Sequence, residues 1–203
     1  MKKRTVTPNT LKQHPTVAIS DAFNAAGHLC AAQLVWHIDK PAAFGFIIVA
    51  VAASVGVLRF GLSEGLFAKA NEDLAALAGF LGLPLVGLSF AKKWLALQIP
   101  CEQQIGFVVA CAIVCALAGS LPPKAKELAL VVFNFFFFLL PVGGFSYANH
   151  DLQTGASIGL FAFAGIVVGA DRYSYMLNIR RENIFHYLIA AASYGMSFGL
   201  VDR

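Results

Sequence analysis

The sequence predicts an all-α membrane protein, a polytopic bundle of about seven transmembrane helices. Of its 203 residues, 58% are hydrophobic and only 13% are charged, whereas a soluble domain has about 25% charged residues. The apolar residues fall in blocks of about 20, the length that crosses a hydrocarbon core of about 30 Å. We expect residues 1–203 to form a single transmembrane helical domain, in which residues 1–16 are a cytoplasmic N-terminal arm.

Seven segments have the length and composition of membrane spans. They cover residues 17–37, 42–62, 73–91, 103–121, 125–147, 154–171 and 184–200. Asn71, Glu72 and Asp73 suit the start of the third span, because acidic and capping side chains favour a helix N-terminus. Pro84 and Pro141 lie inside spans and predict kinks. The first and last spans are the least apolar, so five or six spans is the alternative, with either segment lying at the membrane interface.

The basic residues predict the orientation of the chain. With seven spans, eleven of the 15 Lys and Arg residues lie on the side of the N-terminus, and the other side receives only Lys40, Lys92, Lys93 and Arg203. Cytoplasmic loops carry an excess of Lys and Arg. We therefore expect a cytoplasmic N-terminus and a C-terminus that is outside or lumenal. Because the net charge of +4 comes from short loops, no nucleic-acid partner is expected.

Small residues share one face of the sixth span: Gly155, Gly159, Ala162, Gly165 and Gly169. Gly195 and Gly199 repeat this spacing in the seventh span. Such faces let neighbouring helices approach closely, where van der Waals contact replaces the hydrophobic effect. We expect the sixth span to pack this face against helices of the same chain.

The first span carries polar groups that lipid rejects. Asp21, Asn24 and His28 are spaced by three and seven positions, so they project from one face of a helix. An ionisable group inside a span usually faces a cavity or a partner. We expect these three side chains to face the interior of the bundle.

Further polar residues gather at the same cytoplasmic end. Arg59 ends the second span, Asp171 and Arg172 close the sixth, and His186 opens the seventh, whereas Asn134 lies deeper in the fifth. Together with the polar face of the first span, these residues predict a half-buried cavity that faces the cytoplasm. Within it, Asp21 and Asn24 should lie beside His186. The alternative for a charge at the end of a span is an ordinary interfacial anchor.

No motif of a soluble enzyme is present, neither a G-x-S-x-G elbow, nor H-E-x-x-H, nor a Walker loop. Cys111 and Cys115 are one helical turn apart, but no His or Cys cluster flanks them, so we expect them to pack and not to bind a metal. Catalytic residues are therefore not assigned, and whether the chain is an enzyme stays open.

The end of the chain, RRENIFHYLIAAASYGM (Arg180 to Met196), resembles the last helix of the seven-helix superfamily of alkaline ceramidases and progestin/adiponectin receptors. In the hydrolase members, a His of an early helix and an H-x-x-x-H pair of the last helix hold zinc. His186 would match the first His of that pair, but position 190 is Ala190. A catalytic zinc needs three protein ligands as a rule, and His28 is the one other candidate. The resemblance implies the fold, with no cofactor as the expectation and zinc as the alternative.

Two functions fit these observations. The first is an integral, multi-pass membrane protein whose polar cavity binds or modifies a lipid within the bilayer. The alternative is a non-enzymatic membrane module: a small channel, a transporter or a structural subunit of a membrane complex. Membrane lipids are the expected partners, joined by other membrane subunits in the second case. Stoichiometric zinc in the purified protein would favour an enzyme.

Overall fold

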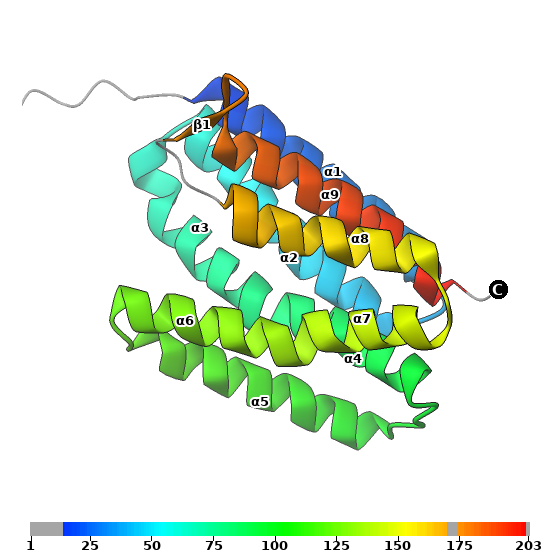
Figure 1. Cartoon of the computed structure of the whole chain (residues 1–203). Coiled ribbons are helices and arrows are strands. Elements are labelled where there is room, and N and C mark those ends of the chain that lie inside the picture. Colours follow the sequence, from blue (N-terminus) through cyan, green and yellow to red (C-terminus); the bar gives the residue numbers. More distant parts are fainter. Residues whose placement is uncertain (1–13, 170–173, 202–203) are drawn as a thin grey trace, which may run out of the picture.

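A computed structural model describes residues 14–169 and 174–201, and it shows an all-α bundle. The predicted arm before residue 14, and the candidates Asp171 and Arg172, lie outside the described residues. Seven helical rods stand side by side and alternate in direction (Figure 1). They are α1 (Pro15–Val35), α2 (Lys40–Gly61), α3–η1–α4 (Glu64–Leu77, Ala78–Gly82, Leu83–Trp94), α5 (Cys101–Gly119), α6–η2–α7 (Pro123–Asn134, Phe135–Leu139, Leu140–Ala148), α8–η3 (Leu152–Phe163, Ala164–Val168) and α9 (Arg181–Leu200).

Four of these rods are long and apolar enough to cross a membrane: Lys40–Gly61, Gly65–Trp94, Cys101–Gly119 and Pro123–Ala148. Leu152–Val168 is a shorter apolar helix. Such lengths are those of spans through a hydrocarbon core of about 30 Å, so the chain has the make-up of a membrane protein. The first and last rods, which the sequence marks as the least apolar, are packed against each other, with α1 between α2 and α9.

The rods follow one another in space much as they do in sequence. Beyond the α1–α2 and α1–α9 contacts, α2 packs on α3 and α4, α4 on α7, and α8 on α9. The α5 helix lies at the edge of the bundle, against η1 and α6. The described chain begins and ends at opposite ends of the bundle (Figure 1). Before α9, β1 (Tyr175–Met176) and β2 (Ile179–Arg180) form a short antiparallel hairpin.

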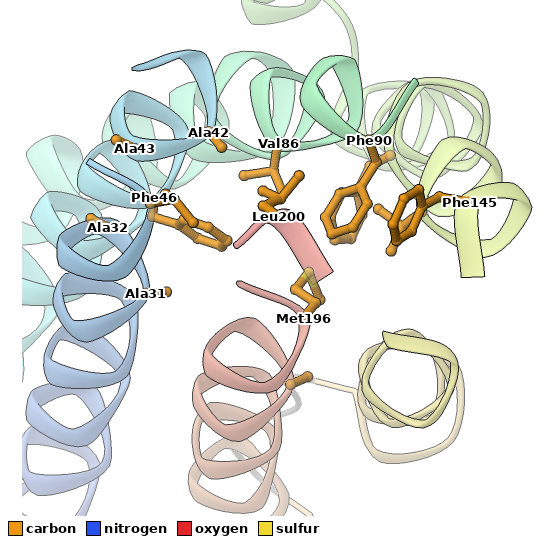
Figure 2. Packing of buried hydrophobic residues seen from close by; sticks show 14 residues of the cluster. Ala31, Ala32, Ala42, Ala43, Phe46, Val86, Phe90, Phe145, Met196 and Leu200 are labelled. Carbon is orange, nitrogen blue, oxygen red and sulfur yellow. The ribbon is translucent and has the colours of Figure 1, made fainter. Parts of the chain in front are cut away.

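A dense apolar core fills the half of the bundle that lies toward the C-terminus. Phe46, Phe90, Phe145, Met196 and Leu200 meet there from α2, α4, α7 and α9 (Figure 2). Alanines of α1 and α2 border these large side chains: Ala31, Ala32, Ala42 and Ala43. Small residues between two helices let their backbones come close, which allows the aromatic rings to fill the remaining space.

A π-helical turn precedes each of the two internal prolines. Pro84 follows η1 and Pro141 follows η2. A proline inside a helix has no N–H to donate and clashes with the carbonyl four residues before it. In these wider turns the backbone bond runs over five residues instead, from Leu83 N–H to the Ala78 carbonyl and from Leu140 N–H to the Phe135 carbonyl. The irregularity expected at each proline therefore takes the form of a π turn.

The third rod begins earlier than the sequence analysis predicts. Ser63 is the N-cap, and its hydroxyl accepts a hydrogen bond from Leu66 N–H at 3.4 Å. Asn71, Glu72 and Asp73 lie inside the helix and do not open it. The prediction was wrong because the residues between cap and span are largely good helix formers, so the helix extends beyond the apolar block.

The glycine face of the sixth rod packs as predicted only at its start, where Gly155 lies against Ser146 of α7. A side chain added at Gly159 or Gly165 would meet open space. The close approach of α8 and α9 instead depends on the glycines of α9, since Gly195 lies against Ser157 and Gly199 against Thr154. The spacing of small residues identifies a face of a helix, but not the direction in which that face points.

Candidate functional site

A cavity of about 410 Å³ occupies the half of the bundle toward the N-terminus. Residues from α1, α2, α3, η1, α4, α6, α8 and α9 line it. Part of its wall is apolar: Val49, Ala53, Leu83, Leu130, Phe161 and Ile189. Its polar lining residues are Asp21, Asn24, His28, Asn71, Asn134, Glu182 and His186. The bundle is therefore filled at one end and hollow at the other.

Asp21 and His186 are neighbours across the contact between α1 and α9. Asp21 Oδ1 lies 3.2 Å from His186 Nδ1, and the Asp21 residue is only 4% exposed. A carboxylate accepts hydrogen bonds, so this pairing favours the imidazole form in which Nδ1 carries a proton. Gly56 of α2 makes room for the carboxylate, because a Cβ at that position would collide with it.

Ser20 extends this pair along the α1–α9 contact. Its hydroxyl oxygen lies 3.1 Å from His186 Nδ1 and 2.9 Å from the Val17 carbonyl. It also lies 3.3 Å from Asn183 Oδ1, to which it donates. Serine and aspartate therefore approach the same ring nitrogen of His186. A serine–histidine–aspartate relay would need them on opposite nitrogens, so this arrangement positions the imidazole and does not form such a triad.

His28 lies deeper in the same wall and is fully buried. Its Nδ1 is 2.9 Å from the Asn24 carbonyl oxygen, and its Nε2 is 2.9 Å from the Ser193 hydroxyl. A carbonyl can only accept, so Nδ1 carries the proton, and in the neutral ring Nε2 accepts from Ser193. Both ring nitrogens are therefore engaged: Nδ1 bonds within α1, and Nε2 joins α1 to α9.

The α2–α3 side of the cavity is held by a buried arginine. Arg59 donates from Nη1 to Asn71 Oδ1 at 3.0 Å, and its Nη2 lies 3.6 Å from Glu72 Oε1. Asn71 in turn donates to the Ala52 carbonyl at 3.3 Å and lines the cavity. Arg59 therefore supports the wall through Asn71 and is not itself a lining residue.

Two asparagine oxygens in this wall have no hydrogen-bond partner within the described part of the chain. They are Asn24 Oδ1 and Asn134 Oδ1, and both atoms are buried. Leaving a buried acceptor unsatisfied costs about 1–3 kcal/mol. Such groups in a folded protein usually meet water or a ligand. Both residues line the cavity, but these two oxygen atoms are themselves covered by neighbouring atoms.

The described residues do not supply the three ligands that a catalytic zinc needs. No group of three His, Cys, Asp or Glu side chains able to hold a metal occurs in the ranges 14–169 and 174–201. Ala190, where the resemblance would place a second histidine, packs against α1 so tightly that a Cβ at Gly27 would come within 2.9 Å of it. An imidazole at this position would force α1 and α9 apart.

The structure brings most of the predicted site residues together. Asp21, Asn24, His28, Asn134 and His186 line one cavity, and Arg59 lies just behind its wall. The sequence analysis did not assign a role in the cavity to Ser20, Gly56, Asn71 or Ser193. The composition around Ser20, which adjoins Asp21, could have indicated it. Asn71 and Gly56 carry no such signal, because their places follow from how α2 packs on α3 and α1.

No family model, curated protein or solved structure matches this chain. What the site can do is therefore argued from its chemistry. A cavity with one apolar and one polar wall can bury a hydrocarbon chain and hydrogen-bond a polar group at the same time. That combination fits an amphipathic molecule.

Proposed function

We propose that this protein is an integral membrane protein that binds an amphipathic molecule, a membrane lipid or a compound like one, in the cavity beside Asp21 and His186. The observation that carries the proposal is the cavity itself, whose lining combines apolar side chains such as Leu83 and Leu130 with the polar side chains of Asp21 and His186. The polar end of the ligand would lie among these polar side chains, and its hydrocarbon chain would lie along Leu83, Leu130 and their apolar neighbours.

The position of the cavity mouth supports entry from the bilayer. Ala75 lines the cavity and is also exposed on the surface of α3. It lies ten residues beyond Gly65, the start of an apolar helix able to span a membrane, which is about 15 Å along the helix axis. The mouth therefore opens on the side of the bundle, where lipid would surround it.

We further propose that all seven rods cross the membrane, with the N-terminus cytoplasmic and the C-terminus outside or lumenal. Seven alternating rods put the two ends of the described chain at opposite ends of the bundle (Figure 1), and the excess of basic residues on the N-terminal side favours this orientation. Epitope tags at each end, probed with and without permeabilisation, test the topology. Detection of both tags on one side would contradict seven crossings.

The lipid-binding proposal is tested by blocking the mouth of the cavity. Ala75→Trp places an indole where Ala75 meets the opening. We expect the purified variant to retain much less co-purifying lipid than the unchanged protein, as measured by native mass spectrometry. Ala116→Trp, at an exposed position on α5, is the matched control and should leave bound lipid unchanged. Equal lipid retention by both variants, with both folded, would contradict the proposal.

A further inference from the structure

We infer that the hairpin before α9 docks on the surface of the membrane, where Leu177 enters the interfacial layer and the basic residues around it bind anionic lipid headgroups. This inference rests on the proposed crossing of the membrane by α8 and α9, and not on ligand binding in the cavity. It follows from the conformation of the hairpin turn, from its level relative to the apolar helices and from the charges around it.

The tip of the hairpin is a two-residue turn in an unfavourable conformation. Its strands pair up to Met176 and Ile179. The two residues between them, Leu177 and Asn178, have φ values of 54° and 63°. Positive φ at both positions is typical of a type I′ turn, which favours Asn, Asp or Gly because a bulky side chain clashes with the backbone there. Asn178 suits its place, and Leu177 does not.

The side chain of Leu177 does not offset this backbone penalty within the described chain, because it is 87% exposed. Strained residues of this kind gather at functional sites. On the two strands, Tyr175 is 62% exposed and Ile179 is 47% exposed. Tyrosine is enriched where a membrane meets water. The hairpin therefore presents an aromatic and two aliphatic side chains to a partner outside this chain.

The hairpin lies at the level of the lipid headgroups. Arg181, the first residue of α9, donates from its guanidinium to the Val167 carbonyl in η3. The adjacent Ile166 is 81% exposed, as expected of a side chain in the hydrocarbon layer, so Arg181 lies at the edge of that layer. The strands continue from this point for two residues each, about 7 Å at 3.3 Å per residue. The headgroup region on one side of a bilayer is about 5–8 Å thick.

The residues around the hairpin are basic. Arg180 and Arg181 join it to α9, and Arg180 donates from Nη1 to His14 Nδ1 at 3.2 Å. The described chain therefore begins beside the second strand of the hairpin. Four more basic residues precede His14 in the sequence, with no Asp or Glu among residues 1–20: Lys2, Lys3, Arg4 and Lys12. Clusters of four to eight Lys and Arg next to a span bind anionic lipids.

The acidic residues of α1 and α9 do not cancel this charge at the surface. Asp21 of α1 is 4% exposed, and Glu182, which follows Arg181, is 5% exposed. Both carboxylates lie inside the bundle, where lipid headgroups do not reach them. The surface around the hairpin therefore has an excess of positive charge, which favours phosphatidylglycerol over the zwitterionic phosphatidylcholine.

The position of Leu177 can be measured by fluorescence. Leu177→Trp is made in the full-length protein with Trp36→Phe and Trp94→Phe, and reconstituted into phosphatidylcholine vesicles with or without phosphatidylglycerol. When phosphatidylglycerol is present, we expect stronger quenching of the indole by lipids brominated on their acyl chains, and weaker quenching by acrylamide in the water. Equal quenching in the two kinds of vesicle would overturn the docking, because the hairpin would then not recognise anionic headgroups.

Leu177→Asn, in the protein with its own tryptophans, removes the apolar tip and introduces a residue that tolerates positive φ. In detergent without lipid we expect its melting temperature to equal or exceed that of the unchanged protein. Added phosphatidylglycerol should raise its melting temperature less than that of the unchanged protein. Leu66→Asn is the matched control, because Leu66 is 75% exposed at the start of α3, at the same end of the bundle, and its response to phosphatidylglycerol should stay unchanged. A full response of Leu177→Asn would contradict the docking.

The charges of the arm are tested separately. Lys3→Gln and Arg4→Gln should each weaken the binding of phosphatidylglycerol about fivefold, the usual contribution of one basic residue near an anionic surface. Unchanged affinity for both variants would overturn the recognition of anionic lipid. None of these measurements involves the cavity, so they can fail while Ala75→Trp still loses its lipid. Epitope tags that both lie on one side would overturn the topology, whatever the quenching of Leu177→Trp shows.

Discussion

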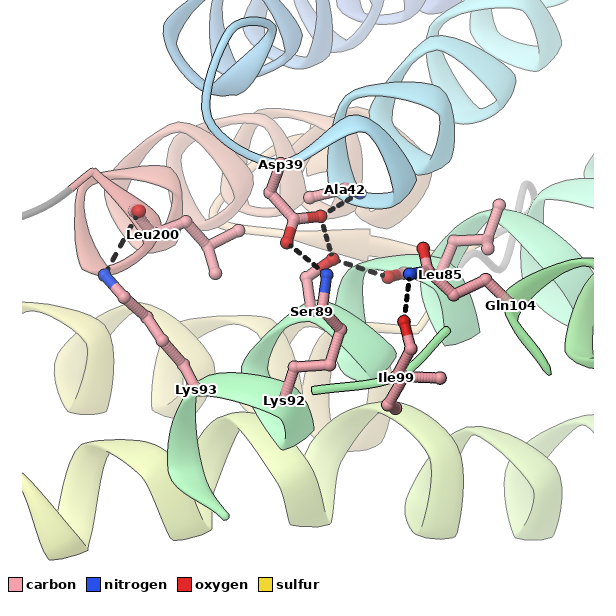
Figure 3. A network of polar contacts seen from close by, with 9 residues as sticks. All are labelled: Asp39, Ala42, Leu85, Ser89, Lys92, Lys93, Ile99, Gln104 and Leu200. Carbon is pink, nitrogen blue, oxygen red and sulfur yellow. Dashed lines mark hydrogen bonds and ion pairs between the residues drawn. The ribbon is translucent and has the colours of Figure 1, made fainter. Parts of the chain in front are cut away.

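The two ends of the bundle hold similar polar residues that differ in how completely they are hydrogen-bonded. Toward the C-terminus, Asp39 accepts from Ala42 N–H at 3.1 Å, from the Ser89 hydroxyl at 2.5 Å and from Lys92 Nζ at 3.0 Å (Figure 3). Nearby, Lys93 donates to the carbonyls that end α9. Toward the N-terminus, Asp21 again lies beside a serine and a basic side chain, but buried amide oxygens around the same cavity have no hydrogen-bond partner within the described residues.

This difference shows what makes a polar residue in a helical bundle a candidate for function. An aspartate, a serine and a basic residue occur at both ends, so residue type alone does not separate them. At the Asp39 end the hydrogen bonds cap α2 and tie it to α4, which is a structural task. At the other end polar side chains border a cavity that the packed helices leave open, which is the setting of a candidate binding site.

The packing around Asp39 is also more complete than the packing around Asp21. The C-terminal half is filled by large side chains such as Phe46, Phe90 and Met196 (Figure 2). The N-terminal half is lined in part by Ala52, Ala53 and other small residues, which leave the space unfilled. Removal of a large side chain should therefore lower the stability more in the filled half than in the hollow half.

The largest expected effect is the loss of an aromatic side chain from the filled half. Phe90→Ala removes a fully buried ring that packs against Phe145, and we expect it to lower the stability by about 3–5 kcal/mol. Phe185→Ala removes a half-buried ring from the wall of the cavity and should cost less than about 2 kcal/mol, because the ring already borders open space. Melting temperatures in detergent compare the two. Equal losses would show that the two halves are packed alike.

A smaller effect is expected for the Asp21–His186 pair. We expect Asp21→Ala and His186→Ala to destabilise the protein singly, and the double variant to cost about 1 kcal/mol less than their sum, because each single change leaves the other partner without its contact. Asp21→Ala combined with Asp39→Asn is the control, since these residues lie at opposite ends of the bundle and their effects should add. Additive effects for Asp21 and His186 would mean that the pair does not couple α1 to α9.

Much of the fold could be predicted from the sequence, because apolar length is a local property. The seven apolar segments correspond to seven rods, whereas the early start of the third rod depended on a cap at Ser63 and helix-forming residues outside the apolar block. The direction of the α8 glycine face could not be predicted, since it depends on the neighbours of α8. For the site, the spacing of Asp21, Asn24 and His28 placed them on one inward face. The cavity itself could not be predicted, because small residues from different helices, such as Ala53 and Gly79, line it only once the helices have packed.

The smallest change in stability is expected for Asn134→Leu, at the hollow end of the bundle. Asn134→Leu replaces an unsatisfied buried amide by an apolar side chain of similar size. The variant loses one local bond to the Leu130 carbonyl, but it also removes the penalty of the buried oxygen. We expect the stability in the absence of ligand to change by less than about 1 kcal/mol, with either sign.

At the Asp39 end the corresponding change has no such compensation. Asp39→Leu removes the acceptor of three hydrogen bonds, leaves the Lys92 charge without its partner, and should cost about 2–4 kcal/mol. Residues kept for binding are often neutral or unfavourable for stability, whereas residues kept for the fold are not. A loss above about 2 kcal/mol for Asn134→Leu would therefore place Asn134 with Asp39 among the structural residues, and the distinction between the two ends would no longer hold.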